Sequence, residues 1–222
     1  MGIYILSEGS KTEPILYSTW LSHLLPTYKQ KPTPDVVGES DYFIISSHGY
    51  PSLLSHIENS IKDVNRYSKF KHFVISLDTD EDTPEIKTKI ILDLIRDNHF
   101  TIDRASLHII AQHRCIETWL LGNKRIIGKG ITDPDLNKLL RNCDLINSDP
   151  EKIEKPPKFS THAQFHLNLL KSIFQHRKSS YSKRNPGIAT EKYYLNEIIY
   201  TNKKGHLASF SVFLQFIRAV SA

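Results

Sequence analysis

The residues best suited to chemistry stand at the end of one apolar run. A strand-like segment, HFVISL, ends at Leu77, and the next five residues, DTDED, contain four acids. If the chain stays extended, the carboxylates of Asp78, Asp80 and Asp82 lie on one side of it, at the strand end where α/β sheets bind ligands. Mg²⁺ prefers carboxylate, water and phosphate oxygens, so this stretch predicts a divalent-metal site. The alternative is a solvated acidic turn in which Asp82 or Thr83 caps the next helix.

A second acidic residue follows the first apolar run of the chain. Residues 3–6 are expected to form a strand, and Glu8 comes just after it, before Gly9, which permits a sharp turn. Carboxyl ends of parallel strands meet at one edge of a sheet. Glu8 is therefore expected to lie near Asp78 and to share its metal-binding or catalytic role.

Glu13 stands at the start of a predicted helix. It either pairs with Ser10 in a capping box or, since Pro14 favours the first helical position, caps the helix itself. In both cases its carboxylate lies close to Glu8, which makes Glu13 a further catalytic candidate.

Strands and helices alternate in the first half of the sequence. Apolar, β-branched runs predict strands at residues 3–6, 42–46, 72–77 and 107–111, and helical spacing predicts helices at 12–25, 53–64 and 84–98. This order predicts an α/β fold with a parallel sheet of about four strands flanked by helices. Residues 26–41 contain three prolines and no periodicity, and are interpreted as a loop.

After residue 111 the pattern predicts helices only, at 115–121, 133–145 and 161–177 and twice more before the end. We therefore expect a catalytic domain of residues 1–122 and a helical C-terminal extension of residues 123–222. Charge follows a similar division. Residues 1–150 hold 17 Lys and Arg against 20 Asp and Glu, whereas residues 151–222 hold 12 against 4. The basic tail is suited to phosphate groups, although a moderately basic surface is common in other proteins too.

The composition indicates a globular protein. Of the 222 residues, 39% are hydrophobic and 24% are charged, and no apolar run approaches the twenty residues of a transmembrane helix. The start, MGIYILSEGS, lacks the basic region of a secretory signal, so a cytoplasmic location is expected. Cys115 and Cys143 are too few for a disulfide framework or a thiolate metal site.

Several basic residues are candidates for contacts with a nucleic-acid backbone. His113 and Arg114 follow the last predicted strand on the ligand side of the sheet, and the loop of residues 177–184 mixes cations with hydroxyls and a tyrosine. The candidates for nucleic-acid binding are Lys11, His113, Arg114, Lys155, Lys183 and Arg184. A solvated linker is the alternative for the loop. His162 and His166 lack the glutamate of a zincin helix and are expected to be structural or surface residues.

Three motifs in order resemble the toprim fold. They are EGSKTEPILY at residues 8–17, DTDED at 78–82 and IETWLL at 116–121. The fuller pattern is most similar to RloB-like and OLD-family toprim nucleases of bacterial defence systems, and the resemblance covers residues 3–122. It implies a Rossmann-like toprim sheet.

The resemblance also implies roles for individual residues. Glu8 matches the toprim glutamate, a metal ligand or acid/base, and Asp78 and Asp80 match the metal-binding aspartates. Asp82 extends the D-x-D-x-D form, at a position that many nucleases of this group do not use. Glu13 and Glu117 match acidic residues of the OLD-like members, and the alternative for Glu117 is a surface glutamate beside an apolar core. OLD-like enzymes add a lysine downstream of the last strand, for which Lys158 is the first candidate and Lys11, Lys155 and Lys183 are competitors.

These roles predict a nuclease that uses two Mg²⁺ or Mn²⁺ ions to cleave DNA or RNA such as tRNA, because paired cations activate water and stabilise the leaving oxygen. The resemblance places it in antiviral defence. The P-loop pattern G-x-x-x-x-G-K-[ST] is absent from the sequence, so a separate ABC/SMC-like ATPase is expected as a partner. The alternatives are a non-catalytic toprim protein that binds nucleic acid or a partner, and a primase-like polymerase, for which the chain is short.

Overall fold

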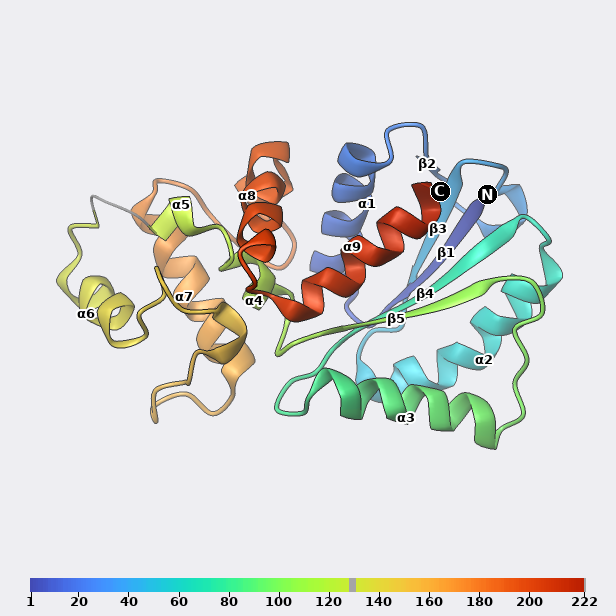
Figure 1. Ribbon diagram of the computed structural model, residues 1–222, viewed down its shortest axis with the longest axis horizontal. Coiled ribbons are helices and arrows are strands. Elements are labelled where there is room, and N and C mark those ends of the chain that lie inside the picture. The colour runs from blue at the N-terminus through green and yellow to red at the C-terminus, as the bar shows by residue number, and fades with distance from the viewer. Residues whose placement is uncertain (128–130, 222) are drawn as a thin grey trace.

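The computed structural model describes residues 1–127 and 131–221 (Figure 1). Its strands are β1 (Gly2–Ser7), β2 (Lys29–Gln30), β3 (Asp41–Ser46), β4 (Phe70–Asp78) and β5 (Ser106–Gln112). They form one parallel sheet in the order β2-β3-β1-β4-β5. The predicted α/β class and parallel sheet are confirmed. The edge strand β2 lies in the segment that was predicted to be a loop.

The two innermost strands, β1 and β4, pair along their length, with Ile5 opposite Val74 and Ser7 opposite Ser76. Both strands are almost entirely buried, which is why they read as continuous apolar runs in the sequence. Their alternate side chains point to opposite faces of the sheet. Because the strands are parallel, their carboxyl ends meet at one edge of the sheet.

The helices are α1 (Thr12–Leu24), α2 (Tyr50–Arg66), α3 (Pro84–Asp97), α4 (Ile116–Leu120), α5 (Lys124–Ile127), α6 (Pro134–Asn142), α7 (His162–His176), α8 (Lys192–Lys203) and α9 (Ala208–Ser221). Three short 3₁₀ helices are η1 (Pro34–Val36), η2 (Pro150–Lys152) and η3 (Gly187–Thr190). Helices α2 and α3 cover one face of the sheet, α1 and α9 cover the other, and α4–α8 lie beyond the carboxyl ends of the strands, on the left in Figure 1. The helical C-terminal extension is confirmed, and α5 is an addition to the predicted helices.

The last helix completes the core of the sheet. Phe210 and Phe213 of α9 lie edge-on or tilted against Trp20 of α1 and Trp119 of α4, with ring centroids 5.0–6.2 Å apart. All four rings are fully buried. One apolar core thus crosses the predicted boundary at residue 122, and the division into two domains stays a prediction.

None of the helices in the described residues combines the length and apolar character needed to cross a membrane.

Candidate functional site

Asp78 is the last residue of β4, and its side chain points to the face covered by α1. Its Oδ1 atom is buried and has no hydrogen-bond partner among the described residues. Burial raises the pKa of Asp78 well above its usual value, and the neighbouring charges of Glu13, Glu117 and Glu8 raise it further. An ionised Asp78 is therefore costly unless a cation comes to it.

Glu8 follows β1 and lies directly beside Asp78, as the meeting of strand ends predicted. Its backbone N–H donates to the carbonyl of Ser76 (2.9 Å), and its Oε2 accepts from the backbone N–H of Asp78 (3.1 Å). Burial raises the pKa of Glu8, the Asp78 N–H lowers it and the charge of Asp80 raises it, with a net increase. The hydrogen bond fixes the Glu8 carboxylate at the sheet edge.

Glu13 lies in the first turn of α1 with only 7% of its surface exposed. Burial raises its pKa to about 7; its own backbone N–H and Lys183 oppose the increase, while Glu117 and Glu8 add to it. Neither predicted cap is found, because the helix begins at Thr12 with Lys11 as N-cap and without a side-chain cap. The Glu13 carboxylate therefore turns into the cluster instead of closing the helix end.

Gly9 is required for the close approach of Glu13. A Cβ at Gly9 would lie 2.0 Å from Oε2 and 2.3 Å from Cδ of Glu13. The φ angle of Gly9 is not in the left-handed region. Its role is thus to leave room for the carboxylate, and not the conformational freedom that the turn suggested.

Glu117 joins the cluster from α4. The residue is buried, so the alternative of a surface glutamate is wrong. Its Oε1 accepts a hydrogen bond from the Tyr181 hydroxyl (2.9 Å), which belongs to a loop more than sixty positions away in the sequence. The charge of Glu117 raises the pKa of both Asp78 and Glu13, which shows that the three carboxylates act on one another.

Lys183 brings a positive charge to these carboxylates. Its backbone carbonyl accepts from the Thr12 hydroxyl (3.1 Å), which ties the loop of residues 177–184 to the start of α1. Burial lowers the pKa of Lys183, but the charges of Glu117 and Asp78 and of other acids outweigh it and leave the pKa raised. The loop is therefore docked at the site and is not a solvated linker.

Glu8, Glu13, Asp78 and Lys183, but not Glu117, line a cavity of about 270 Å³ at the carboxyl edge of the sheet. It is lined by Glu8, Gly9, Ser10, Lys11, Thr12, Glu13, His48, Gly49, Asp78 and Lys183. His48 was missed in the sequence. The signal was present, because the turn of residues 47–51 follows β3 and so comes to the same edge, where His48 and Gly49 both adopt positive φ angles.

Asp80 and Asp82 do not line up with Asp78. Strand β4 ends at Asp78 and the chain turns at Asp80, which has a φ angle of 53° and is exposed, so the extended geometry was wrong. Asp82 forms an ion pair with Lys87 (3.3 Å), and the N-cap of α3 is Thr83, whose hydroxyl accepts from the backbone N–H of residue 86. Asp80 remains near enough for its charge to raise the pKa of Glu8. Its metal-binding role stays a prediction.

Lys158, the first choice for the catalytic lysine, lies outside the cavity. It is exposed, lines a different pocket with Asp133 and Asp135, and has its Nζ 5.2 Å from the Phe159 ring centroid. Lys155 donates to the carbonyl of Phe159 and does not line the cavity either. Both lysines belong to the segment that connects η2 to α7. The loop that docks on α1 is a different one, residues 177–184. Lys183 is therefore the lysine that the fold places with the carboxylates.

The remaining basic candidates flank the acidic turn after β4. Arg114 lies 3.8 Å from Glu81 and donates to the carbonyl of Asp80 (3.3 Å). The backbone N–H of His113 donates to the Ser209 hydroxyl. Neither residue lines the carboxylate cavity, whereas Lys11 does. Arg184 is exposed next to Lys183.

The two histidines of α7 have structural contacts, as predicted. The His162 backbone N–H donates to Glu81 (2.7 Å), and its Nδ1 lies 2.7 Å from the other oxygen of that carboxylate. His166 is fully buried, with Nδ1 2.8 Å from the Thr118 hydroxyl. Helix α7 thereby holds the turn that carries Asp80.

Within residues 1–127 and 131–221, no three His, Cys, Asp or Glu side chains are already arranged as a metal-binding group. The chemistry of the cluster nevertheless fits Mg²⁺ or Mn²⁺. Its potential ligands are carboxylate oxygens, Asp78 Oδ1 lacks a hydrogen-bond partner, and burial and repulsion raise the pKa of Asp78, Glu13 and Glu8. A divalent cation bound by these carboxylates would remove that repulsion.

No protein family model, no curated protein and no solved structure matches this chain. The resemblance to toprim nucleases therefore stays a prediction, and the site is interpreted from its geometry.

Proposed function

We propose that this protein is a Mg²⁺- or Mn²⁺-dependent nuclease, with DNA ahead of RNA as its substrate. The observation that carries the proposal is the meeting of four carboxylates and one lysine from separate elements at the carboxyl edge of the sheet. They are Glu8, Glu13, Asp78, Glu117 and Lys183. Burying carboxylates together destabilises a protein unless a cation compensates them, so such a cluster is expected only where it has a function.

The residues divide into two roles. Asp78 and Glu8 would hold one cation, and Glu13 and Glu117 are available to a second. Bound cations of this kind lower the pKa of water and stabilise charge on phosphate oxygens. Lys183 stabilises the negative charge that develops on the phosphate during cleavage. Without metal the pKa of Glu13 is raised to about 7, so the Glu13 carboxyl group would have to release its proton when it binds a cation near neutral pH.

The position of the cavity supports a polymeric substrate. It lies at the carboxyl edge of the sheet, where Lys11 and Lys183 line it and Arg184, the residue after Lys183, is exposed. Such cations contact a phosphate backbone without selecting a base sequence. By the resemblance, the enzyme would act in phage defence beside a separate ABC/SMC-like ATPase.

A second candidate is a protein that binds nucleic acid without cleaving it. The observation that favours it is that the carboxylates are gathered but not closed into a metal-binding group in the described part of the chain.

The test is cleavage of plasmid DNA, single-stranded DNA and tRNA with Mg²⁺, Mn²⁺ or EDTA, with and without a cognate ATPase. We expect cleavage by the wild type with either metal, and a loss of about a hundredfold or more in Asp78→Asn and Glu8→Gln, because each variant removes a cation ligand. Lys183→Ala should also lower the rate. Lys158→Ala is the matched control, since it removes the same group outside the cavity. Wild type and variants that are equally inert would leave the binding protein as the better account, and undiminished cleavage by Asp78→Asn would refute the proposed site.

A further inference from the structure

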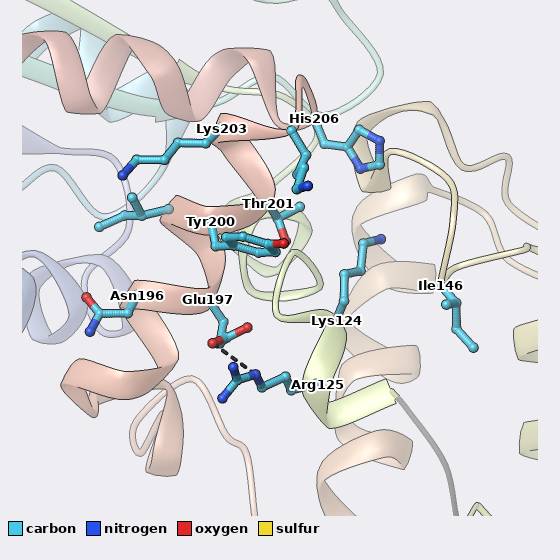
Figure 2. Close-up of a pocket in the computed structure, with 11 residues that line it drawn as sticks. Lys124, Arg125, Ile146, Asn196, Glu197, Tyr200, Thr201, Lys203 and His206 are labelled. Carbon is cyan, nitrogen blue, oxygen red and sulfur yellow. Dashed lines mark ion pairs between the residues drawn. The ribbon is translucent and has the colours of Figure 1, made fainter.

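A second and larger cavity lies away from the carboxylates, among α5, the loop after α6 and the C-terminal half of α8 (Figure 2). Its volume is about 730 Å³, within the range of pockets that bind small molecules. None of its lining residues belongs to the carboxylate cavity. It is therefore a separate site, and its chemistry can be considered independently.

The lining of this cavity is strongly basic. Four Lys or Arg side chains line it against one carboxylate: Lys124, Arg125, Lys203, Lys204 and Glu197. The carboxylate is already paired, because Arg125 Nε lies 3.1 Å from Glu197 Oε1, the ion pair drawn in Figure 2. The remaining lysine charges therefore favour an anionic ligand.

One of these lysines is held in place by the protein. Lys124 Nζ donates to the backbone carbonyls of Leu145 and Ser148. These hydrogen bonds fix the ammonium group at the cavity wall. His206 adds a polar ring whose Nδ1 is buried without a hydrogen-bond partner among the described residues. The cavity thus has a positioned cation and a further polar group for a ligand.

An exposed aromatic ring distinguishes this cavity from a simple anion site. Tyr200 has 56% of its surface exposed, and Lys204 Nζ lies 5.2 Å from its ring centroid. Figure 2 shows the ring on the α8 side, Ile146 on the opposite side and Lys124 between them. Ile146 is also 53% exposed. The exposed ring of Tyr200 suits a nucleobase, which stacks on such rings whatever its identity.

We propose that this cavity binds a nucleotide, with the base against Tyr200 and the phosphate against Lys204 and the anchored Lys124. The nucleotide is either a free mononucleotide or one unit of a single strand, since both present an unstacked base and a phosphate. Polyglutamate, which stands for an acidic peptide, offers the negative charge but no planar ring for Tyr200. The proposal needs no cleavage, so it stands or falls separately from the nuclease activity.

The experiment measures fluorescence anisotropy of a short labelled oligothymidylate in EDTA, where metal-dependent cleavage is absent. Tyr200→Ala should weaken binding about tenfold, Tyr200→Phe should bind like the wild type, and Lys204→Glu should weaken binding and lower its salt dependence. Lys171→Glu is the matched control, because it makes the same charge change on exposed α7, outside the cavity. Circular dichroism checks that each variant is folded.

Competition with unlabelled ligands identifies the source of the nucleotide. If AMP displaces the labelled oligonucleotide, the cavity is assigned to a free nucleotide. If the unlabelled oligonucleotide displaces it and AMP does not, the cavity is assigned to a single strand. Both outcomes support the proposal. The proposal is overturned if Tyr200→Ala and Lys204→Glu bind like the wild type, or if polyglutamate competes as well as the oligonucleotide, since an acidic protein would then be the partner. An Asp78→Asn variant that still binds but does not cleave separates this result from the nuclease test.

Discussion

Replacing Gly9 by Ala should damage the candidate site through Glu13 alone. The added Cβ would lie 2.0 Å from the Glu13 carboxylate, whereas ordinary contacts lie at ~3.5 to 4 Å, so the carboxylate must move. Overpacking costs about 1–3 kcal/mol. Relief of the buried charge offsets it, because a pKa raised from 4.5 to about 7 corresponds to roughly 3 kcal/mol for the ionised form. Above pH 7 the free energy of unfolding of the metal-free protein should therefore stay unchanged or rise by up to about 2 kcal/mol.

Metal affinity should fall in this variant even though the protein does not lose stability. Displacing the Glu13 carboxylate removes a ligand, and we expect Mn²⁺ binding to weaken at least about tenfold in Gly9→Ala. In a Glu13→Ala background the same glycine substitution should have no further effect, because the clashing group is gone. Calorimetric titration and urea denaturation of the two single variants and the double variant measure this cycle. Equal losses from Gly9→Ala in both backgrounds would refute the steric account and indicate a backbone role for the glycine.

Three further predictions concern stability. Glu13→Gln should raise the free energy of unfolding of the metal-free protein near pH 8 by up to about 3 kcal/mol. The reason is that the wild-type carboxyl group is protonated in both the folded and the unfolded state below pH 4.5, and the protein loses stability as the pH rises from 4.5 to about 7. Urea titrations at both ends of that range check it, and the same pH dependence of stability in both proteins would contradict it. Tyr181→Phe should cost about 1–3 kcal/mol in thermal unfolding, because it leaves buried Glu117 without this donor, and an unchanged melting temperature would argue against the contact. Thr83→Ala should lower the free energy of unfolding by about 1 kcal/mol, because it removes the N-cap of α3. Asp82→Ala should lower it less, because the Asp82 side chain of the ion pair with Lys87 is about half exposed. If urea denaturation gives the reversed order, Asp82 is the cap.

Periodicity in the sequence was sufficient for most of the fold. The buried strands β1, β3, β4 and β5 appear as apolar runs, and the long helices appear through their apolar spacing. Strand β2 has two exposed polar residues and no apolar pattern, so nothing in its sequence indicated a strand. It is defined only by pairing with β3.

The site was predictable where strand ends determine it. Glu8 and Asp78 meet because β1 and β4 are parallel neighbours. The alignment of Asp80 with Asp78 depended on an extended chain, which ends when Asp80 turns into the left-handed region. No local pattern records such a turn before the fold is known.

The contacts of Glu117 and Lys183 depend on tertiary docking. Tyr181 and Lys183 reach the carboxylates from a loop distant in sequence, through hydrogen bonds to Glu117 and Thr12. Spacing along the chain could not distinguish Lys183 from Lys158. The choice is made by the loop's position against α1, which only the assembled structure provides.

The most direct test of the central claim is a calorimetric titration of the protein with Mn²⁺ near pH 7 in two buffers of different ionisation enthalpy. If the carboxylate cluster holds the cation, binding should release protons, because the pKa of Glu13 is raised to about 7 and that of Asp78 is raised as well, and the ligands must ionise. Asp78→Asn should abolish most of the binding, and Lys158→Ala should leave it unchanged. Mn²⁺ that binds equally well to Asp78→Asn, or fails to bind the wild type, would contradict the account.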